Sequence, residues 1–246
     1  MVIVPCFNEE ERLPIKEFQF SSEKYNWMDF LFVDDGSRDA TATILRSLAE
    51  QSPERFRFLP LSKNSGKAEA VRQGMLSGLS LQGYGYYGFL DADLSSPPEE
   101  FQFLMEFSDW RGGNHNFIFG SRLKILGANI FRNPMRHYSG RIAATAASVC
   151  LQLPVYDTQC GIKLFRKNVC QQIFNEPFIS RWLFDVEIFF RLMINLEKSE
   201  FDRTVLEVPL RTWEEAPGTK LGFMDALRVP LELLRIRRKY SKLVRS

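Results

Sequence analysis

Histidine and cysteine are scarce in this chain, and their spacing argues against a zinc site. The 246 residues include two histidines and four cysteines, and no two cysteines form a Cys-x-x-Cys pair. Structural zinc sites need clusters of these residue types at short spacings, and disulfide-stapled domains need paired cysteines in an oxidising compartment. We therefore expect reduced thiols in a cytosolic protein, without a zinc ion or a disulfide framework.

Long apolar runs and a strong net charge are also missing. The uncharged stretch 142–156 is 15 residues long and contains Thr, Ser, Gln and Pro, whereas a membrane-spanning helix needs about 20 apolar residues. An apolar strand-like run begins at Val2, so we expect no signal peptide. The net charge of +2 argues against a protein that binds nucleic acid over its whole surface.

Positive charge is concentrated at the C-terminus. Residues 221–246 contain seven basic and two acidic side chains, which leaves residues 1–220 with a net charge of −3. We predict a domain at 1–221 and a basic amphipathic helical segment at 222–246 that lies on an anionic membrane surface. The alternative is a C-terminal helix packed on the domain. The apolar residues expected on one face of this segment are Phe223, Leu227, Leu231, Leu234 and Ile236.

Short apolar runs alternate with helical segments through the first half of the chain. This alternation predicts an α/β fold with a mostly parallel, Rossmann-like central sheet flanked by helices. A further strand is expected at Ile162–Phe165, followed by a helix at Ile188–Leu196 and a strand at Val205–Leu210. The first five expected strands are Val2–Pro5, Phe30–Val33, Phe56–Leu61, Tyr86–Leu90 and Phe117–Phe119.

Polar residues follow four of these strands at the point where each one ends. In parallel sheets ligands bind beyond the carboxyl ends of the strands, so these residues are expected to share one crevice. Each pair taken singly also suits a turn or a helix cap. The four groups are Asn8-Glu9, Asp34-Asp35, Lys63-Asn64 and Asp91-Ala92-Asp93.

The Asp91-Ala92-Asp93 triplet predicts a site for Mg²⁺ or Mn²⁺, with Asp93 as a direct ligand. Such cations bind through one or two carboxylates and take their other ligands from water and substrate phosphate. Asp35 could accept hydrogen bonds from a base or ribose. Arg122 and Lys67 are candidate counter-charges for phosphate, although Lys67 could equally be a solvated lysine at a helix start.

Four segments follow one another along the chain: VIVPCFNEE (2–10), VDDGS (33–37), NSGKA (64–68) and DADLS (91–95). Their sequences and order resemble those of inverting glycosyltransferases of family two, which have a GT-A fold. The segments GSR (120–122), DTQCGIK (157–163), RWLFDVE (181–187), WE (213–214) and GTKL (218–221) resemble one subgroup. That subgroup contains the dolichyl-phosphate β-glucosyltransferases and related polyprenyl-phosphate sugar transferases.

The resemblance implies transfer of a hexose, with glucose from UDP-glucose favoured, to a polyprenyl phosphate. Alternatives are GDP-mannose or another donor, a saccharide acceptor, or a nucleotide-sugar-binding module without catalysis. Ser95 stands where related mannosyltransferases often carry Gln as a further metal ligand, which disfavours GDP-mannose. The implied donor-binding residues are Pro5, Phe7, Glu9, Asp35, Asp91, Ala92, Asp93, Arg122 and Lys220.

Two carboxylates are candidates for the acceptor side. We favour Asp157 over Asp185 as the catalytic group, because Asp157 directly precedes the Gln-Cys-Gly turn. Asp185 could instead pair with Arg181 across one helical turn. A polyprenyl phosphate is already anionic at pH 7, so the site would supply positioning and charge neutralisation more than proton abstraction.

Three arginines are candidate ligands for the acceptor phosphate, with a solvated basic face as the alternative. The reaction would take place at the cytoplasmic face of a membrane, to which the protein would be peripherally bound. The sequence leaves the oligomeric state open. The three arginines are Arg132, Arg136 and Arg141.

Overall fold

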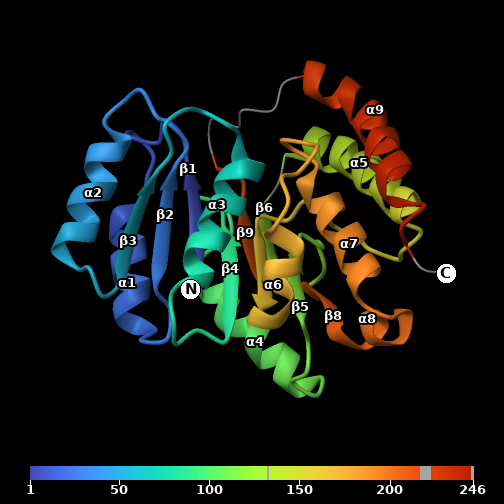
Figure 1. Ribbon diagram of the computed structural model, residues 1–246, viewed down its shortest axis with the longest axis horizontal. Helices are drawn as coiled ribbons and strands as arrows, with labels where there is room; N and C mark the ends of the chain where they lie inside the picture. The colour runs from blue at the N-terminus through green and yellow to red at the C-terminus, as the bar shows by residue number, and fades with distance from the viewer. Residues whose placement is uncertain (132, 217–222, 245–246) are drawn as a thin grey trace.

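A seven-stranded sheet forms the centre of the molecule (Figure 1). The computed structural model describes residues 1–131, 133–216 and 223–244, with only the backbone described for 134–139 and 223–228. The strand order is β3-β2-β1-β4-β7-β5-β8. The strands are β1 (Val2–Cys6), β2 (Phe30–Asp34), β3 (Phe56–Pro60), β4 (Tyr86–Leu90), β5 (Phe117–Ser121), β7 (Ile162–Arg166) and β8 (Val205–Pro209).

One strand of this sheet runs against the others. β7 is antiparallel to both β4 and β5, whereas the remaining neighbours pair in parallel. The prediction of a mostly parallel sheet is confirmed, with this one exception. Leu90 pairs with Ile162, so the residues that precede β7 lie beside those that follow β4. The reversal therefore brings residues 157–161 to the carboxyl edge of the parallel strands.

Helices cover both faces of the sheet. The apolar side chains of each strand alternate between the two layers: Val4 and Phe32 face one cluster, and Ile3 and Val33 face the other. The first face carries α1 (Ile15–Lys24), α2 (Thr41–Gln51) and α4 (Glu99–Trp110). The second carries α3 (Lys67–Leu79), α5 (Pro134–Leu151), α6 (Lys167–Phe174), α7 (Phe184–Asn195), α8 (Lys198–Thr204) and α9 (Phe223–Tyr240).

Helix α9 packs on the domain. Figure 1 shows it beside α5, and it contacts both α5 and α7. Leu233, Ile236 and Tyr240 are buried, whereas Leu231 and Leu234 are 70% and 53% exposed. The prediction that Ile236 shares a face with Leu231 and Leu234 is therefore wrong, because a side chain five positions beyond Leu231 points to the opposite side of a helix. The Phe223 and Leu227 side chains lie outside the described part.

A second, two-stranded sheet completes the fold. β6 (Asn129–Phe131) and β9 (Thr212–Glu214) form a separate parallel pair next to the edge of the main sheet where the candidate site lies. None of the helices in the described ranges is both long enough and apolar enough to cross a membrane.

Candidate functional site

Asp35 shapes the loop that leads into α3. Its two carboxylate oxygens accept hydrogen bonds from the backbone N–H groups of Ser65 and Gly66, each at 2.7 Å. Burial raises the pKa of Asp35, and the two amide bonds only partly offset that rise. Both oxygens keep a second acceptor position, so a contact from Asp35 to a nucleoside remains a prediction.

Gly66 lets an arginine reach this loop. Its φ is +96°, and a Cβ at this position would lie 2.5 Å from Nε of Arg181. Arg181 also donates to Oδ1 of Asn64 at 2.8 Å. The sequence suggested Arg181 only as a partner for Asp185, so the contacts of Arg181 with Asn64 and Gly66 were not predicted.

Lys67 and Asp91 form an ion pair at the end of β4. The Nζ of Lys67 lies 2.5 Å from Oδ1 of Asp91, and a Cβ on Gly161 would lie 2.4 Å from Oδ2 of the same carboxylate. Burial by itself lowers the pKa of Lys67, but Asp91 and Asp185 raise it by more, so the net shift is upward. The solvated-lysine alternative for Lys67 is therefore wrong.

A second ion pair lies behind the first, in the core. Lys163 is fully buried on β7, and its Nζ lies 2.7 Å from Oδ1 of Asp185 on α7. The ammonium also donates to the carbonyl of Cys160 at 2.6 Å. Burial raises the pKa of Asp185, and Lys163 and Lys67 offset only part of the rise. The alternative pairing of Asp185 with Arg181 is wrong, because Asp185 pairs with Lys163 and α7 begins only at Phe184.

Arg122, which follows β5, and Asp157, in the loop before β7, form a bidentate pair. Nε and Nη2 of Arg122 donate to the two carboxylate oxygens at 2.6 and 2.8 Å, and its backbone N–H donates at 3.1 Å. The backbone N–H of Gln159 supplies a fourth bond at 3.2 Å. Burial alone raises the pKa of Asp157, but Arg122 overrides this and lowers the pKa to about 2.

The bonding of Asp157 bears on its predicted catalytic role. All four acceptor positions of the carboxylate are occupied, and a group with a pKa near 2 is a weak base. This geometry suits a residue that holds Arg122 in place. Glu207, on β8, fixes the loop that contains Asp157. Its carboxylate accepts the backbone N–H of Asp157 at 2.8 Å and that of Tyr156 at 2.9 Å.

The two carboxylates of the Asp-x-Asp triplet fit a hard divalent cation. Asp93 is exposed, and Oδ1 of Asp91 is buried against the ammonium of Lys67. No three His, Cys, Asp or Glu side chains cluster closely enough to hold a metal within residues 1–131, 133–216 and 223–244. Ser95 stands where related mannosyltransferases often carry a metal ligand. Here its backbone carbonyl positions β9 by accepting the N–H of Glu214 at 2.9 Å. Such a cation would need ligands from the donor.

The remaining predicted residues divide into placed and undescribed ones. Pro5 belongs to β1, Ala92 is buried, and Phe7 lies in the loop beyond Cys6. The carboxylate of Glu9 pairs with Arg12 at 2.7 Å. Arg141 lies over the ring of Tyr156, 3.6 Å from its centroid, and donates to its carbonyl at 2.7 Å. Arg132, Lys220 and the Arg136 side chain lie outside the described residues.

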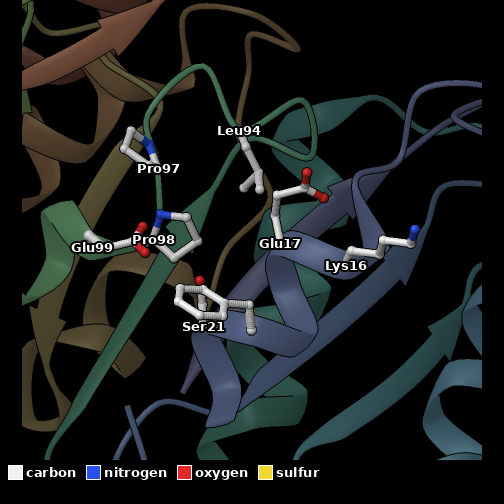
Figure 2. Close-up of a pocket in the computed structure, with 8 residues that line it drawn as sticks. Lys16, Glu17, Ser21, Leu94, Pro97, Pro98 and Glu99 are labelled. Carbon is white, nitrogen blue, oxygen red and sulfur yellow. The ribbon is translucent and has the colours of Figure 1, made fainter. Parts of the chain in front are cut away.

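A separate pocket lies between α1 and the loop that joins β4 to α4. Figure 2 shows Leu94, Pro97 and Pro98 on one side of it and Glu17 and Ser21 on the other. Its lining contains none of the predicted site residues. The predicted residues lie instead around open loops at the edge of the sheet.

Comparison with known proteins identifies the family. The family model described as Glycosyl transferase family 2 matches residues 1–174. The chain belongs to glycosyl transferase family 2. The predicted family and the assignment as a glycosyltransferase are thereby confirmed.

Relatives of this family 2 chain extend over nearly its whole length. The dolichyl-phosphate beta-glucosyltransferase of Saccharomyces cerevisiae is 30% identical, with 97% of this chain and 74% of the relative covered. The enzyme of the same name from Homo sapiens is 28% identical, with 97% and 75% covered.

Solved structures confirm the fold. Glucosyl-3-phosphoglycerate synthase from Mycobacterium tuberculosis, in complex with Mn²⁺, UDP-glucose and phosphoglyceric acid, superposes with a TM-score of 0.62 at 16% identity, covering 96% of this chain and 79% of that one. Mannosyl-3-phosphoglycerate synthase from Rubrobacter xylanophilus gives 0.65 at 15% identity, covering 97% and 72%. The predicted GT-A architecture of this family 2 chain is therefore confirmed.

Proposed function

We propose that this glycosyltransferase moves glucose from UDP-glucose to a polyprenyl phosphate with inversion at the anomeric carbon. One observation carries the proposal: the Asp-x-Asp carboxylates and the Arg122–Asp157 pair line the same edge of the sheet, on either side of β7. One cluster suits a donor diphosphate and the other a second phosphate. Relatives named for glucosyl transfer to dolichyl phosphate support the choice of substrates.

The reaction is a single displacement. An oxygen of the polyprenyl phosphate forms a bond to C1 of glucose as the bond from C1 to the diphosphate breaks, and UDP leaves. The attacking oxygen is already anionic, so no proton has to be removed. Asp91 and Asp93 would hold Mg²⁺ or Mn²⁺, which when bound offsets charge on the diphosphate.

The protein's own residues position the reactants. The guanidinium of Arg122 has a fixed orientation, because Asp157 holds two of its nitrogens. A fixed guanidinium can bind a phosphate with little loss of side-chain entropy. We assign Arg122 to phosphate binding and Asp157 to holding Arg122. Arg141, stacked on Tyr156 next to Asp157, is a candidate for binding the acceptor phosphate.

A transfer assay tests the substrates. With Mg²⁺ present, we expect UDP-glucose and polyprenyl phosphate to give a β-linked glycolipid, detected by mass spectrometry and assigned by NMR. The matched control acceptor is the unphosphorylated polyprenol, which lacks the anionic oxygen and should give no product. Faster turnover with GDP-mannose, or equal transfer to a free saccharide, would contradict the proposal.

We also propose that α5 and α9 face an anionic membrane at its cytoplasmic leaflet, where such lipids are concentrated. Ile142 and Val149 on α5 are 74% and 65% exposed, and Leu231 and Leu234 are exposed on the neighbouring α9. Exposed apolar side chains beside cations suit the lipid interface. The exposed basic residues are Arg235, Arg238, Lys239 and Lys242.

Co-sedimentation with vesicles tests this surface. Each cation near an anionic surface contributes about 1 kcal/mol, so replacing Arg235 and Arg238 together by serine should weaken binding to phosphatidylserine vesicles by about 2 kcal/mol. Leu234→Ser should also weaken binding. The matched control is Phe20→Ser, because Phe20 is 57% exposed but lies on α1, across the sheet. An equal loss in the Phe20 variant would rule out this face.

A further inference from the structure

Lys67 stands where a cation ligated by Asp91 would have to approach. It is the first residue of α3, and the loop before it is fixed by the two amide bonds to Asp35. Within the described residues, its ammonium is the one ion-pair partner of Asp91. The backbone at Gly161 packs closely against the other oxygen of that carboxylate. The Lys67 side chain is still 28% exposed, so a ligand at this edge of the sheet can reach it.

We propose that Lys67 competes with the divalent cation for Asp91 and is drawn away by the donor diphosphate, so that metal and nucleotide sugar bind together. An ammonium 2.5 Å from Oδ1 and a dication on the same oxygen would repel each other strongly at such short range. One of the two has to leave the carboxylate. The inference rests on the proposed donor and metal site and adds a coupling between the two ligands to it.

The charges around Lys67 explain why a second partner is required. Three carboxylates (Asp91, Asp93 and Asp185) and two ammonium groups (Lys67 and Lys163) lie close enough to interact electrostatically. Asp185 is already paired with Lys163 inside the core, so Lys67 could turn to Asp185 only by sharing that carboxylate with Lys163. A diphosphate offers Lys67 new anionic oxygens at the moment when the cation takes its place at Asp91.

The consequence is a thermodynamic coupling between the two ligands. Metal alone has to displace the ammonium with no compensation, whereas metal together with a nucleoside diphosphate gives the ammonium a new partner. By linkage, the nucleotide must raise metal affinity by the same factor as the metal raises nucleotide affinity. Without Lys67, the first step loses its competitor and the coupling weakens.

Binding of Mn²⁺ to the full chain, followed by the EPR signal of free Mn²⁺, tests the proposal without any measurement of turnover. We expect Lys67→Met to bind Mn²⁺ alone about tenfold or more tightly than the unmodified chain, because a nearby positive charge is removed. With saturating UDP the gain should shrink or reverse. Lys167→Met is the matched control, because Lys167 is an exposed lysine that is also the first residue of its helix, α6, but lies at the opposite edge of the sheet. It forms no ion pair in the described residues, so this variant should leave Mn²⁺ affinity unchanged.

Combining variants keeps the result interpretable. In an Asp91→Asn background, Lys67→Met should not raise Mn²⁺ affinity, because the carboxylate for which the ammonium and the metal compete is absent. Circular dichroism checks that each variant folds. Unchanged or weaker binding of Mn²⁺ alone to Lys67→Met would overturn the inference, as would a gain that persists in Asp91→Asn. Failure of Mn²⁺ to bind even with UDP would instead remove the proposed metal site.

Discussion

Replacing Asp157 with asparagine is expected to lower kcat/KM about 10²- to 10³-fold, the usual cost of losing one well-placed charge-stabilising group. Asparagine keeps the shape of the side chain but offers one acceptor oxygen in place of two. The bidentate grip on Arg122 is lost, and a largely buried guanidinium is left without its counter-charge. The loss arises through Arg122, the group we place on a phosphate.

A double-mutant cycle separates this role from general-base catalysis. If Asp157 acts through Arg122, then Arg122→Ala should reduce kcat/KM by a similar factor, and the double variant should be little worse than either single one. A catalytic base would instead give losses that multiply. Steady-state kinetics with UDP-glucose and polyprenyl phosphate measure all four chains. Multiplying losses would restore Asp157 as the catalytic group.

The pH dependence offers an independent check on the same residue. The folded-state pKa of Asp157 is lowered to about 2, below the value of about 4 expected in the unfolded chain. The stabilisation from the ion pair is therefore fully present above about pH 4 and is lost as the pH falls through about 2. Any limb of the kcat/KM profile between pH 5 and 9 belongs to another group.

Replacing Lys163 with methionine is expected to lower the free energy of unfolding by about 3–5 kcal/mol, because it leaves a buried carboxylate without a partner. Lys163 is fully buried, and Asp185 is nearly so. Denaturant unfolding measures the loss. Methionine matches the length of the lysine stem, so the effect reports the missing charge and not a large cavity.

The paired control removes the second charge as well. A variant with Lys163→Met and Asp185→Leu should regain most of the lost stability, since no unpaired charge stays in the core. If Asp185 is only structural, activity should recover with stability. If it also serves the predicted catalytic role, the double variant should be stable yet inactive. A Lys163→Met protein as stable as the unmodified chain would show that the ion pair contributes nothing.

The position of a site residue could be predicted from the sequence wherever it depended only on where one strand ends. Runs such as Tyr86–Leu90 predicted buried strands, and the residues after them lie at a common edge, because parallel strands present their carboxyl ends together. The bonding partners were not predictable in this way. Lys67 meets Asp91, and Lys163 meets Asp185, across sequence gaps that no local spacing rule covers.

Strand direction was the other gap. The apolar run Ile162–Phe165 has the same pattern whether the strand runs up or down the sheet, because side chains alternate identically in both cases. One signal was available and unused: a lysine inside a run expected to be buried needs an acidic partner nearby. That rule, applied to Lys163, would have directed attention to a core carboxylate such as Asp185.

The reversed strand also sets the order in which the protein can be assembled. β4 and β5 have no contact as neighbouring strands; β7, made some forty residues after β5, is inserted between them. Until that insertion the carboxylate at residue 91 follows β4 and the arginine at 122 follows β5, whose neighbours β7 and β8 are both made later. In a growing chain on the ribosome, the edges of β4 and β5 that β7 will join are therefore left open. The two parts of the candidate site come together only when β7 pairs with both strands in one long-range step.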